Sequence, residues 1–240
     1  MRGLIYAGVA AAALSACSVG NAEDGGPATA RNFPVGAFSK LEVAGPFDVD
    51  VTTGGQPGVR VNGPSKLVEK MVVEVQADTL VIRPEKRTGW FSRGFHWSGG
   101  KARVAVSVPM LTRASIAGSG DIDINRIAGQ SFSGEIAGSG NMRVADLRVE
   151  SLRFGIAGSG KLAAVGQARQ AHYEIAGSGD IQADRVASEE LKVEIAGSGN
   201  VAANARSTAS VEIAGAGDVR VTGGAKCSVS KAGSGNVRCS

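Results

Sequence analysis

Ile116-Ala-Gly-Ser-Gly-Asp-Ile-Asp-Ile124 is a stretch whose pattern the second half of this 240-residue chain repeats. Its centre, Ala-Gly-Ser-Gly, starts at Ala117, Ala137, Ala157, Ala176, Ala196 and Ala232, with an Ala-Gly-Ala-Gly variant at Ala214. The starts are 18 to 20 residues apart. A constant period of this size is typical of a solenoid, in which each repeat forms one coil and buries its apolar face against its neighbours.

Apolar residues alternate with polar ones on both sides of the glycine turn. The column directly before the turn contains Ile116, Ile136, Ile156, Ile175, Ile195 and Ile213. After the turn the alternation resumes, for example at Ile122 and Ile124. A period of two indicates a strand with one buried face, and no repeat has a helical period. The sequence therefore predicts an all-β fold, a parallel β-helix (solenoid) with coils of about 19–20 residues.

Two polar columns follow the turn. The serines of the motif, Ser119, Ser139, Ser159, Ser178 and Ser198, are predicted to be structural and to form a hydroxyl ladder. A nucleophile needs an adjacent base, and the chain has two histidines, His96 and His172. The next column is Asp121, Asn141, Lys161, Asp180, Asn200, Asp218 and Asn236, so identical charges do not stack on one another.

The first half contains looser versions of the pattern. Leu41–Val51 overlays Val211–Val221 almost position for position, and Val73–Ile82 is a weaker copy. Ser65–Met71 is predicted to form one or two helical turns with Ser65 as the cap. We expect one solenoid over 33–240, with irregular early coils and strict repeats at 113–240. A separate small β domain at 33–110 is the alternative.

The combination of motifs resembles a known bacterial family. Phe38–Val49 has the form Phe-x-x-Leu-x-Val-x-Gly-x-Phe-Asp-Val, and Leu80-Val-Ile82 and Val106–Leu111 precede the Gly-Ser-Gly-Asp/Asn repeats. These features, over about 200 residues, resemble the family labelled "putative auto-transporter adhesin, head GIN domain". The resemblance implies a right-handed β-helix on cell-envelope proteins, and it implies neither catalytic residues nor a cofactor.

The N-terminus predicts an exported, lipid-anchored protein. Arg2 and the apolar run 4–14 are typical of a signal peptide, here residues 1–16. Leu14-Ser-Ala-Cys17 resembles the bacterial lipoprotein box, which implies lipidation of Cys17 and attachment to a membrane. Ser18 after the cysteine, by resemblance to enterobacterial sorting, favours the outer membrane. Residues 17–32 are predicted to be a flexible tether. The alternative is an ordinary cleavage site beside an unrelated cysteine.

Charge and composition limit the partners. Removal of residues 1–16 takes away only Arg2 and leaves 25 basic against 22 acidic residues. This small excess, without a basic run among aromatics on a strand platform, argues against nucleic acid as a partner. The chain has no cysteine–histidine metal spacing, so we expect no metal site and no cofactor.

Residues 84–101 interrupt the strand pattern. Four of the eleven aromatic residues of the chain lie within eight positions there. Exposed aromatics among basic residues contact glycans, lipid headgroups and proteins through stacking and cation–π attraction. The alternative is a segment that folds back and caps the solenoid. The candidate binding residues are Arg87, Trp90, Phe91, Arg93, Phe95, His96 and Trp97.

An outward column of glutamates precedes the isoleucine column, at Glu135, Glu174, Glu194 and Glu212. Two residues upstream, Arg153, His172 and Lys192 form a basic column. Stacked glutamates repel one another, and the basic column offers diagonal partners. We predict a charge-paired sheet face in preference to a cation site.

The last coil has two special features. Cys227 and Cys239 fall in inward columns on either side of the last glycine turn, and we predict that they form a disulfide; two buried thiols are the alternative. Lys231 replaces the isoleucine of its column. Because an open sheet edge templates further strands, we interpret Lys231 as a residue that protects the end of the solenoid.

The leading functional hypothesis is a non-enzymatic envelope lipoprotein whose rigid surface binds a polysaccharide, peptidoglycan or a protein. A polysaccharide-active enzyme is the first alternative, since β-helices often carry such activities. Glycosidases need two converging carboxylates, whereas the acidic residues here repeat along a face. A structural element that polymerises end to end is the second alternative.

Overall fold

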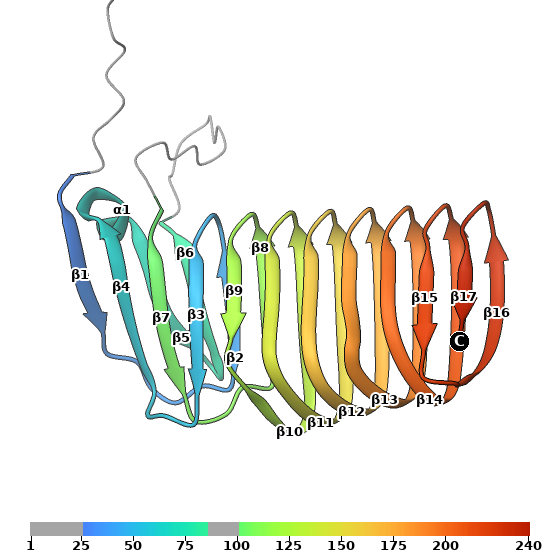
Figure 1. Cartoon of the computed structure of the whole chain (residues 1–240). Coiled ribbons are helices and arrows are strands. Elements are labelled where there is room, and N and C mark those ends of the chain that lie inside the picture. The colour runs from blue at the N-terminus through green and yellow to red at the C-terminus, as the bar shows by residue number, and fades with distance from the viewer. Residues whose placement is uncertain (1–25, 86–100) are drawn as a thin grey trace, which may run out of the picture.

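The computed structural model describes residues 26–85 and 101–240 as an almost entirely β structure. Its strands in these residues belong to one sheet, and Ser65–Glu69 forms the short helix α1 (Figure 1). The strands are β1 (Ala28–Phe33), β2 (Lys40–Ala44), β3 (Asp48–Thr53), β4 (Gly58–Pro64), β5 (Met71–Gln76), β6 (Thr79–Pro84), β7 (Arg103–Val108), β8 (Arg113–Gly118), β9 (Asp121–Ile124), β10 (Ile127–Gly138), β11 (Asn141–Gly158), β12 (Lys161–Gly177), β13 (Asp180–Gly197), β14 (Asn200–Gly215), β15 (Val219–Thr222), β16 (Lys226–Ala232) and β17 (Val237–Cys239).

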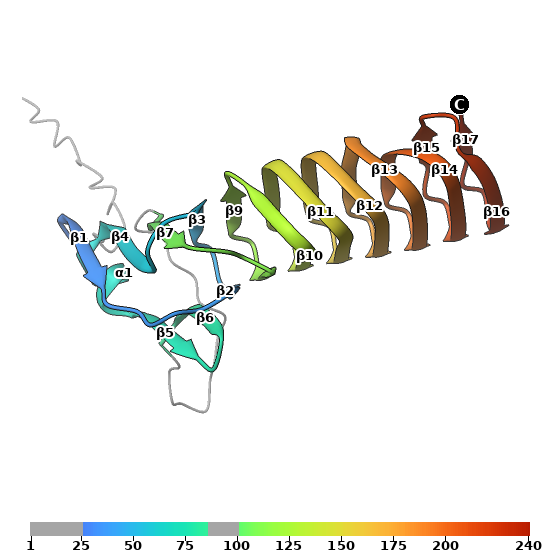
Figure 2. The same cartoon turned by 90° about the horizontal axis from the view of Figure 1, so that it is seen from below.

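The repeats form a β-solenoid of about six turns with coils of about 20 residues. Strands β10 to β14 each bend through the length of a coil and pair with the next in parallel (Figures 1 and 2). The pairing preserves the sequence columns, so that Ile136 lies opposite Ile156 and Ile175 opposite Ile195. The isoleucines of this column are buried, and the alternation predicted the inward face correctly.

Glycine is required at the turn because neighbouring backbones nearly touch there. Gly158 has a φ of 132°, a region that side chains disfavour. A Cβ atom placed on Gly158 would also collide with the carbonyl oxygen of Gly138 on the preceding coil. The repeated motif is thus explained by the stacking of the coils.

The spatial order of the first half differs from its sequence order. Strand β2 lies in parallel between β6 and β8, and β3 lies in parallel between β7 and β9. Val43 is opposite Ile116 and Val49 is opposite Ile122, so Leu41–Val51 stacks directly on the first strict repeat. These pairings join the two halves in one sheet (Figure 2).

Three local predictions for the first half were wrong. Val73–Ile82 is an antiparallel hairpin of β5 and β6, turning at Ala77 with a φ of 54°, and not a coil. The end of the predicted tether, residues 28–32, belongs to β1, which pairs antiparallel with β4. Helix α1 is present, but Pro64 stands at its N-cap and Ser65 makes no capping hydrogen bond. The pairing of β1 with β4 joins segments that are distant in the sequence, whereas the hairpin and the helix cap are local differences.

The far end of the solenoid has a free edge. Among the described strands, β16 pairs with β14 and β17 pairs with β15, each on one side. Val229 of β16 is 45% exposed, whereas Val211, its neighbour on β14, is fully buried. Within residues 26–85 and 101–240, no helix is long and apolar enough to span a bilayer.

Candidate functional site

Several predicted site residues lie outside the described residues. These are the lipidation site Cys17 and the candidate binding residues Arg87, Trp90, Phe91, Arg93, Phe95, His96 and Trp97. Their predicted roles stay predictions. The candidate site below is built from residues that the structure does describe.

The predicted disulfide is present in the last coil. Cys227 and Cys239 are bonded, with their Cα atoms 6.6 Å apart. Cys227 lies in register with Ala209 and Cys239 with Val221, in the columns that the sequence assigns to them. The bond links β16 to β17 across the final turn and therefore ties the two edge strands together.

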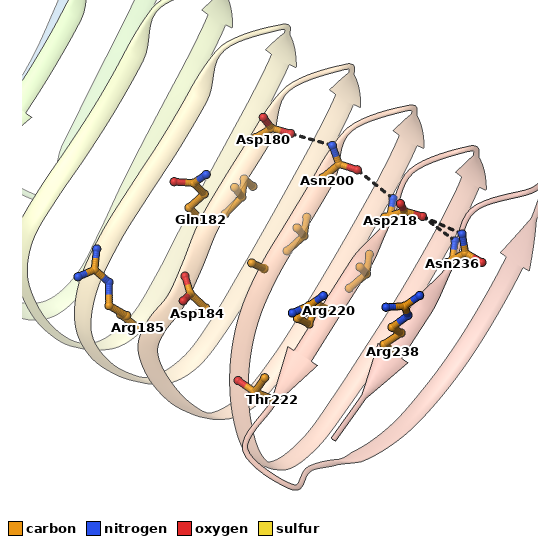
Figure 3. Close-up of a pocket in the computed structure, with 14 residues that line it drawn as sticks. Asp180, Gln182, Asp184, Arg185, Asn200, Asp218, Arg220, Thr222, Asn236 and Arg238 are labelled. Carbon is orange, nitrogen blue, oxygen red and sulfur yellow. Dashed lines mark hydrogen bonds between the residues drawn. The ribbon is translucent and has the colours of Figure 1, made fainter.

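A groove runs across the outward face of β13, β14, β15 and β17, on the side that follows the glycine turns (Figure 3). Its volume is about 930 Å³, and its polar lining comes from Asp180, Gln182, Asp184, Arg185, Asn200, Asp218, Arg220, Thr222, Asn236 and Arg238. Alternate residues of these strands, such as Ile181 and Val219, point inward and are buried. The strand alternation therefore fixes the outward direction of the lining, and we call this surface the polar groove.

One edge of the polar groove is a ladder of carboxylates and amides. Asn200 Nδ2 donates to Asp180 Oδ1 at 3.0 Å, and Asn236 Nδ2 donates to Asp218 Oδ1 at 3.1 Å. The backbone N–H of Asp218 donates to Asn200 Oδ1 at 3.3 Å, which makes the ladder continuous (Figure 3). Because Asp alternates with Asn in this column, the amide of an Asn can donate to the carboxylate of the Asp on the preceding coil.

The predicted ladder of serine hydroxyls is not found. The serines before this column use their backbones instead, as where Ser159 N–H donates to the Gly138 carbonyl at 2.9 Å. Among the described residues, the hydroxyls of the motif serines make no hydrogen bond with one another. Asp and Asn side chains of neighbouring coils come within hydrogen-bonding distance because they are longer than serine side chains.

Two guanidinium groups lie side by side within the polar groove. Arg220 on β15 is in register with Arg238 on β17, and both side chains are exposed. Neither has an ion-pair partner in the described part of the chain. The sequence reasoning missed this pair, although both arginines stand two positions after the Asp/Asn column and share one column.

The face before the turns carries the predicted charge pairs. Arg153 donates to Glu174 at 3.0 Å, and Glu194 contacts His172 at 2.9 Å and Lys192 at 2.8 Å. The hydrogen bond from Lys192 lowers the pKa of Glu194 and raises the pKa of Lys192. The contacts of Arg153 with Glu174 and of His172 with Glu194 confirm the predicted diagonal pairing, whereas Lys192 and Glu194 pair within one strand.

Three side chains on this face are of types that can bind a metal ion. The ligand atoms of His172, Glu174 and Glu194 lie within 4.8 Å of one another. Both carboxylates, however, already bind the cationic groups of Arg153 and Lys192. A metal would have to displace these cations, so the geometry favours a charge-paired surface.

Solved structures share this fold over most of their length. A "putative adhesin" from Bacteroides fragilis superposes with a TM-score of 0.82 at 23% identity, covering 89% of this chain and 97% of the other. A "putative adhesin" from Parabacteroides merdae gives 0.70 at 20% identity, covering 90% and 98%. A "putative lipid binding protein" from Parabacteroides distasonis gives 0.69 at 22% identity, covering 90% and 97%. At these identities the likeness establishes the fold alone.

The family of the chain comes from a comparison of its sequence with family models. A comparison with curated proteins finds no match. Residues 37–225 match the family model described as "putative auto-transporter adhesin, head GIN domain". That range includes the early coils, all strict repeats but the last coil, and most of the polar groove. The chain therefore belongs to the head GIN domain family, as its opening strand and Gly-Ser-Gly repeats indicate.

Proposed function

We propose that this protein is a non-enzymatic binding protein of the bacterial cell envelope and that its polar groove binds a glycan. The observation that carries the proposal is the groove's lining, where carboxylates, amides and guanidinium groups recur at the spacing of neighbouring strands. These groups donate and accept hydrogen bonds in fixed planes, which suits the hydroxyl groups of a sugar polymer. The adhesin names of the family and of the similar structures support a binding role.

The solenoid supports such a site by its rigidity. The groove lies on four strands; the inward residues of β13, β14 and β15 belong to one buried core, and Val237 of β17 packs against it. Side chains held on strands are positioned more precisely than side chains on loops, so binding costs little conformational entropy. An extended ligand that follows the stack of coils would contact several equivalent positions.

A polysaccharide-active enzyme is the second candidate, because the groove contains Asp180, Asp184 and Asp218. Two of these carboxylates accept hydrogen bonds from neighbouring asparagines in the ladder. This use of the carboxylates supports a binding role over acid–base catalysis.

We further propose that acyl chains on Cys17 anchor the protein to the outer membrane and that the aromatic segment 84–101 contributes to binding. The support is the lipoprotein box at Leu14–Cys17 and the concentration of aromatic residues. The test for the anchor is Cys17→Ser, which should move the protein to the soluble periplasmic fraction or leave an uncleaved precursor. A processed variant that stays with the membrane would contradict the anchor.

The glycan site is tested with the full chain in detergent on immobilised peptidoglycan and neutral and acidic polysaccharides. Ala202 lies on the groove surface, so Ala202→Trp should block retention by filling it. The matched control is Ala128→Trp, at an exposed position of β10 outside the groove. A Trp90→Ala/Trp97→Ala variant reports on the aromatic segment.

Three results would contradict parts of the proposal. Retention on none of the polymers would contradict glycan binding. Normal retention of Ala202→Trp would place the site elsewhere. Release of new reducing ends from a bound polymer, abolished by Asp180→Asn or Asp218→Asn, would favour the enzyme.

A further inference from the structure

We propose that Arg220 and Arg238 make the polar groove selective for glycans that carry carboxylate groups, such as polyuronates, over neutral glycans. The inference rests on the proposed glycan-binding function and adds the class of ligand. Its basis is the stacking of two guanidinium groups, without ion-pair partners in the described part of the chain, on the last two strands that line the groove.

The two arginines are held next to each other by the register of the sheet. Val219, Arg220 and Val221 of β15 pair in parallel with residues 237–239 of β17. Neighbouring strands are about 4.8 Å apart, so the two side chains leave the sheet at nearly the same place. Figure 3 shows both next to each other on neighbouring strands, beyond Asp218 and Asn236 of the Asp/Asn ladder.

Stacking two like charges raises the free energy of the folded protein unless a counter-charge is present. Several other basic residues on this solenoid have carboxylate partners, such as Arg113 with Glu135, Arg153 with Glu174 and Arg169 with Glu150. Arg220 and Arg238 have no such partner among residues 26–85 and 101–240. The arrangement therefore leaves a concentrated positive charge available to a ligand.

The nearest acidic groups of the ladder are already engaged. Asp218 accepts hydrogen bonds from both the backbone and the side-chain N–H groups of Asn236, at 3.1 Å each. Asp180 accepts from Asn200 and lies 4.0 Å from the ammonium of Lys161. These contacts reduce the tendency of the ladder to neutralise the arginine pair.

The chemistry of the groove distinguishes among anionic ligands. A guanidinium group binds a carboxylate through two parallel N–H···O bonds, and two adjacent guanidinium groups would hold acid groups along a polymer. The ladder beside them offers acceptors for hydroxyl groups. A polymer with a charge on every unit but few hydroxyl groups, such as a nucleic acid, would offer few donors to the ladder's acceptors. An acidic polysaccharide satisfies both halves of the groove.

The experiment compares the full chain, purified in detergent, on two polymers with the same backbone: polygalacturonate and its methyl-esterified, uncharged form. The wild type is expected to bind polygalacturonate more tightly, with an affinity that falls as salt increases. Arg220→Gln/Arg238→Gln should lower the affinity for polygalacturonate about tenfold and leave the esterified polymer unaffected.

The matched control is Arg143→Gln/Arg206→Gln, which removes two exposed positive charges outside the groove. This control should bind as the wild type does. Because all four arginines are exposed, neither variant should unfold below the wild-type temperature.

Four results would overturn the inference. Equal wild-type affinity for the two polymers would contradict the selectivity without contradicting glycan binding. An equal loss in both double variants would indicate attraction to overall charge. Binding to phosphatidylglycerol vesicles with no retention on polygalacturonate would identify an anionic lipid as the ligand. Retention on neither polymer nor peptidoglycan would contradict the proposed function as well.

Discussion

The ring of Phe154 occupies the space that a side chain at Gly134 would fill. The two residues are in register on β10 and β11, in an inward column that continues with Tyr173, Val193 and Val211. A Cβ atom at Gly134 would lie 3.1 Å from the Phe154 ring and 3.0 Å from the sulfur of Met142. Phe154 in turn stacks on Tyr173, with ring centroids 5.7 Å apart. The glycine and the large ring are thus complementary.

This complementarity predicts an energetic coupling. Gly134→Val should lower the free energy of unfolding by about 1–3 kcal/mol, because the added atoms collide with the ring. Phe154→Val should lower it by leaving a cavity. The double variant should recover part of both losses, since valine then fits at both positions, as at Val193 and Val211. Chemical denaturation of the four proteins measures the coupling, and strictly additive losses would contradict it.

A second prediction concerns the hydroxyl group of Tyr173. The side chain is 1% exposed, and its hydroxyl has no hydrogen-bond partner among the described residues. A buried polar group without a partner is destabilising, so Tyr173→Phe should raise the free energy of unfolding by about 1 kcal/mol. Thermal and chemical denaturation check this, and a lower stability of the variant would reveal a partner for the hydroxyl.

The same residue predicts a dependence of stability on pH. Burial raises the pKa of Tyr173 above its ordinary value. A group whose pKa is higher in the folded state contributes stability that is present below its unfolded pKa, about 10, and is lost as the pH rises above it. Wild-type stability should therefore fall above about pH 10, and Tyr173→Phe should remove that part of the fall. Equal alkaline profiles of the two proteins would contradict the assignment.

A third prediction concerns the free edge. Lys231 lies opposite Ile213, and its ammonium donates to the Gly235 carbonyl at 3.2 Å. Lys231→Ile would continue the isoleucine column onto the edge beside the exposed Val229, and should cause concentration-dependent association. Sedimentation velocity measures this. Lys226→Ile, at an exposed position of the same strand, is the control. Similar association of both variants would contradict a specific role of Lys231 in protecting the edge.

A fourth prediction concerns the disulfide. Replacing both Cys227 and Cys239 by serine should lower the free energy of unfolding of the last coil by about 2–3 kcal/mol, because the bond closes a short loop between two edge strands. Mass spectrometry of unreduced peptides identifies the bond, and hydrogen exchange of residues 226–239 measures the local loss. Free thiols in exported protein, or unchanged exchange in the double variant, would contradict its stabilising role.

The regular half of the molecule was predictable because its contacts are repetitive. In an in-register stack, each residue meets the same column in the next coil, so a one-dimensional alignment specifies three-dimensional neighbours. The stacking of the buried isoleucines follows from this rule, and the pairing of Arg153 with Glu174 follows from the adjacency of two such columns. The bond between Cys227 and Cys239 follows from the inward direction of both positions on either side of one turn. The family was also predictable from the sequence, because the opening strand and the turn motif resemble those of the family.

The irregular half and the polar groove depended on the tertiary structure. The insertion of β2 between β6 and β8, the hairpin of β5 and β6, and the pairing of β1 with β4 do not follow the order in which a regular period would stack these segments. The column of Arg220 and Arg238 is readable in the sequence, but whether their charges are paired depends on distances to side chains on other columns. The sequence by itself determined the stacking of the coils, because a period encodes equivalent neighbours. Only the folded chain decided which charges remain unpaired, because that depends on contacts the period does not encode.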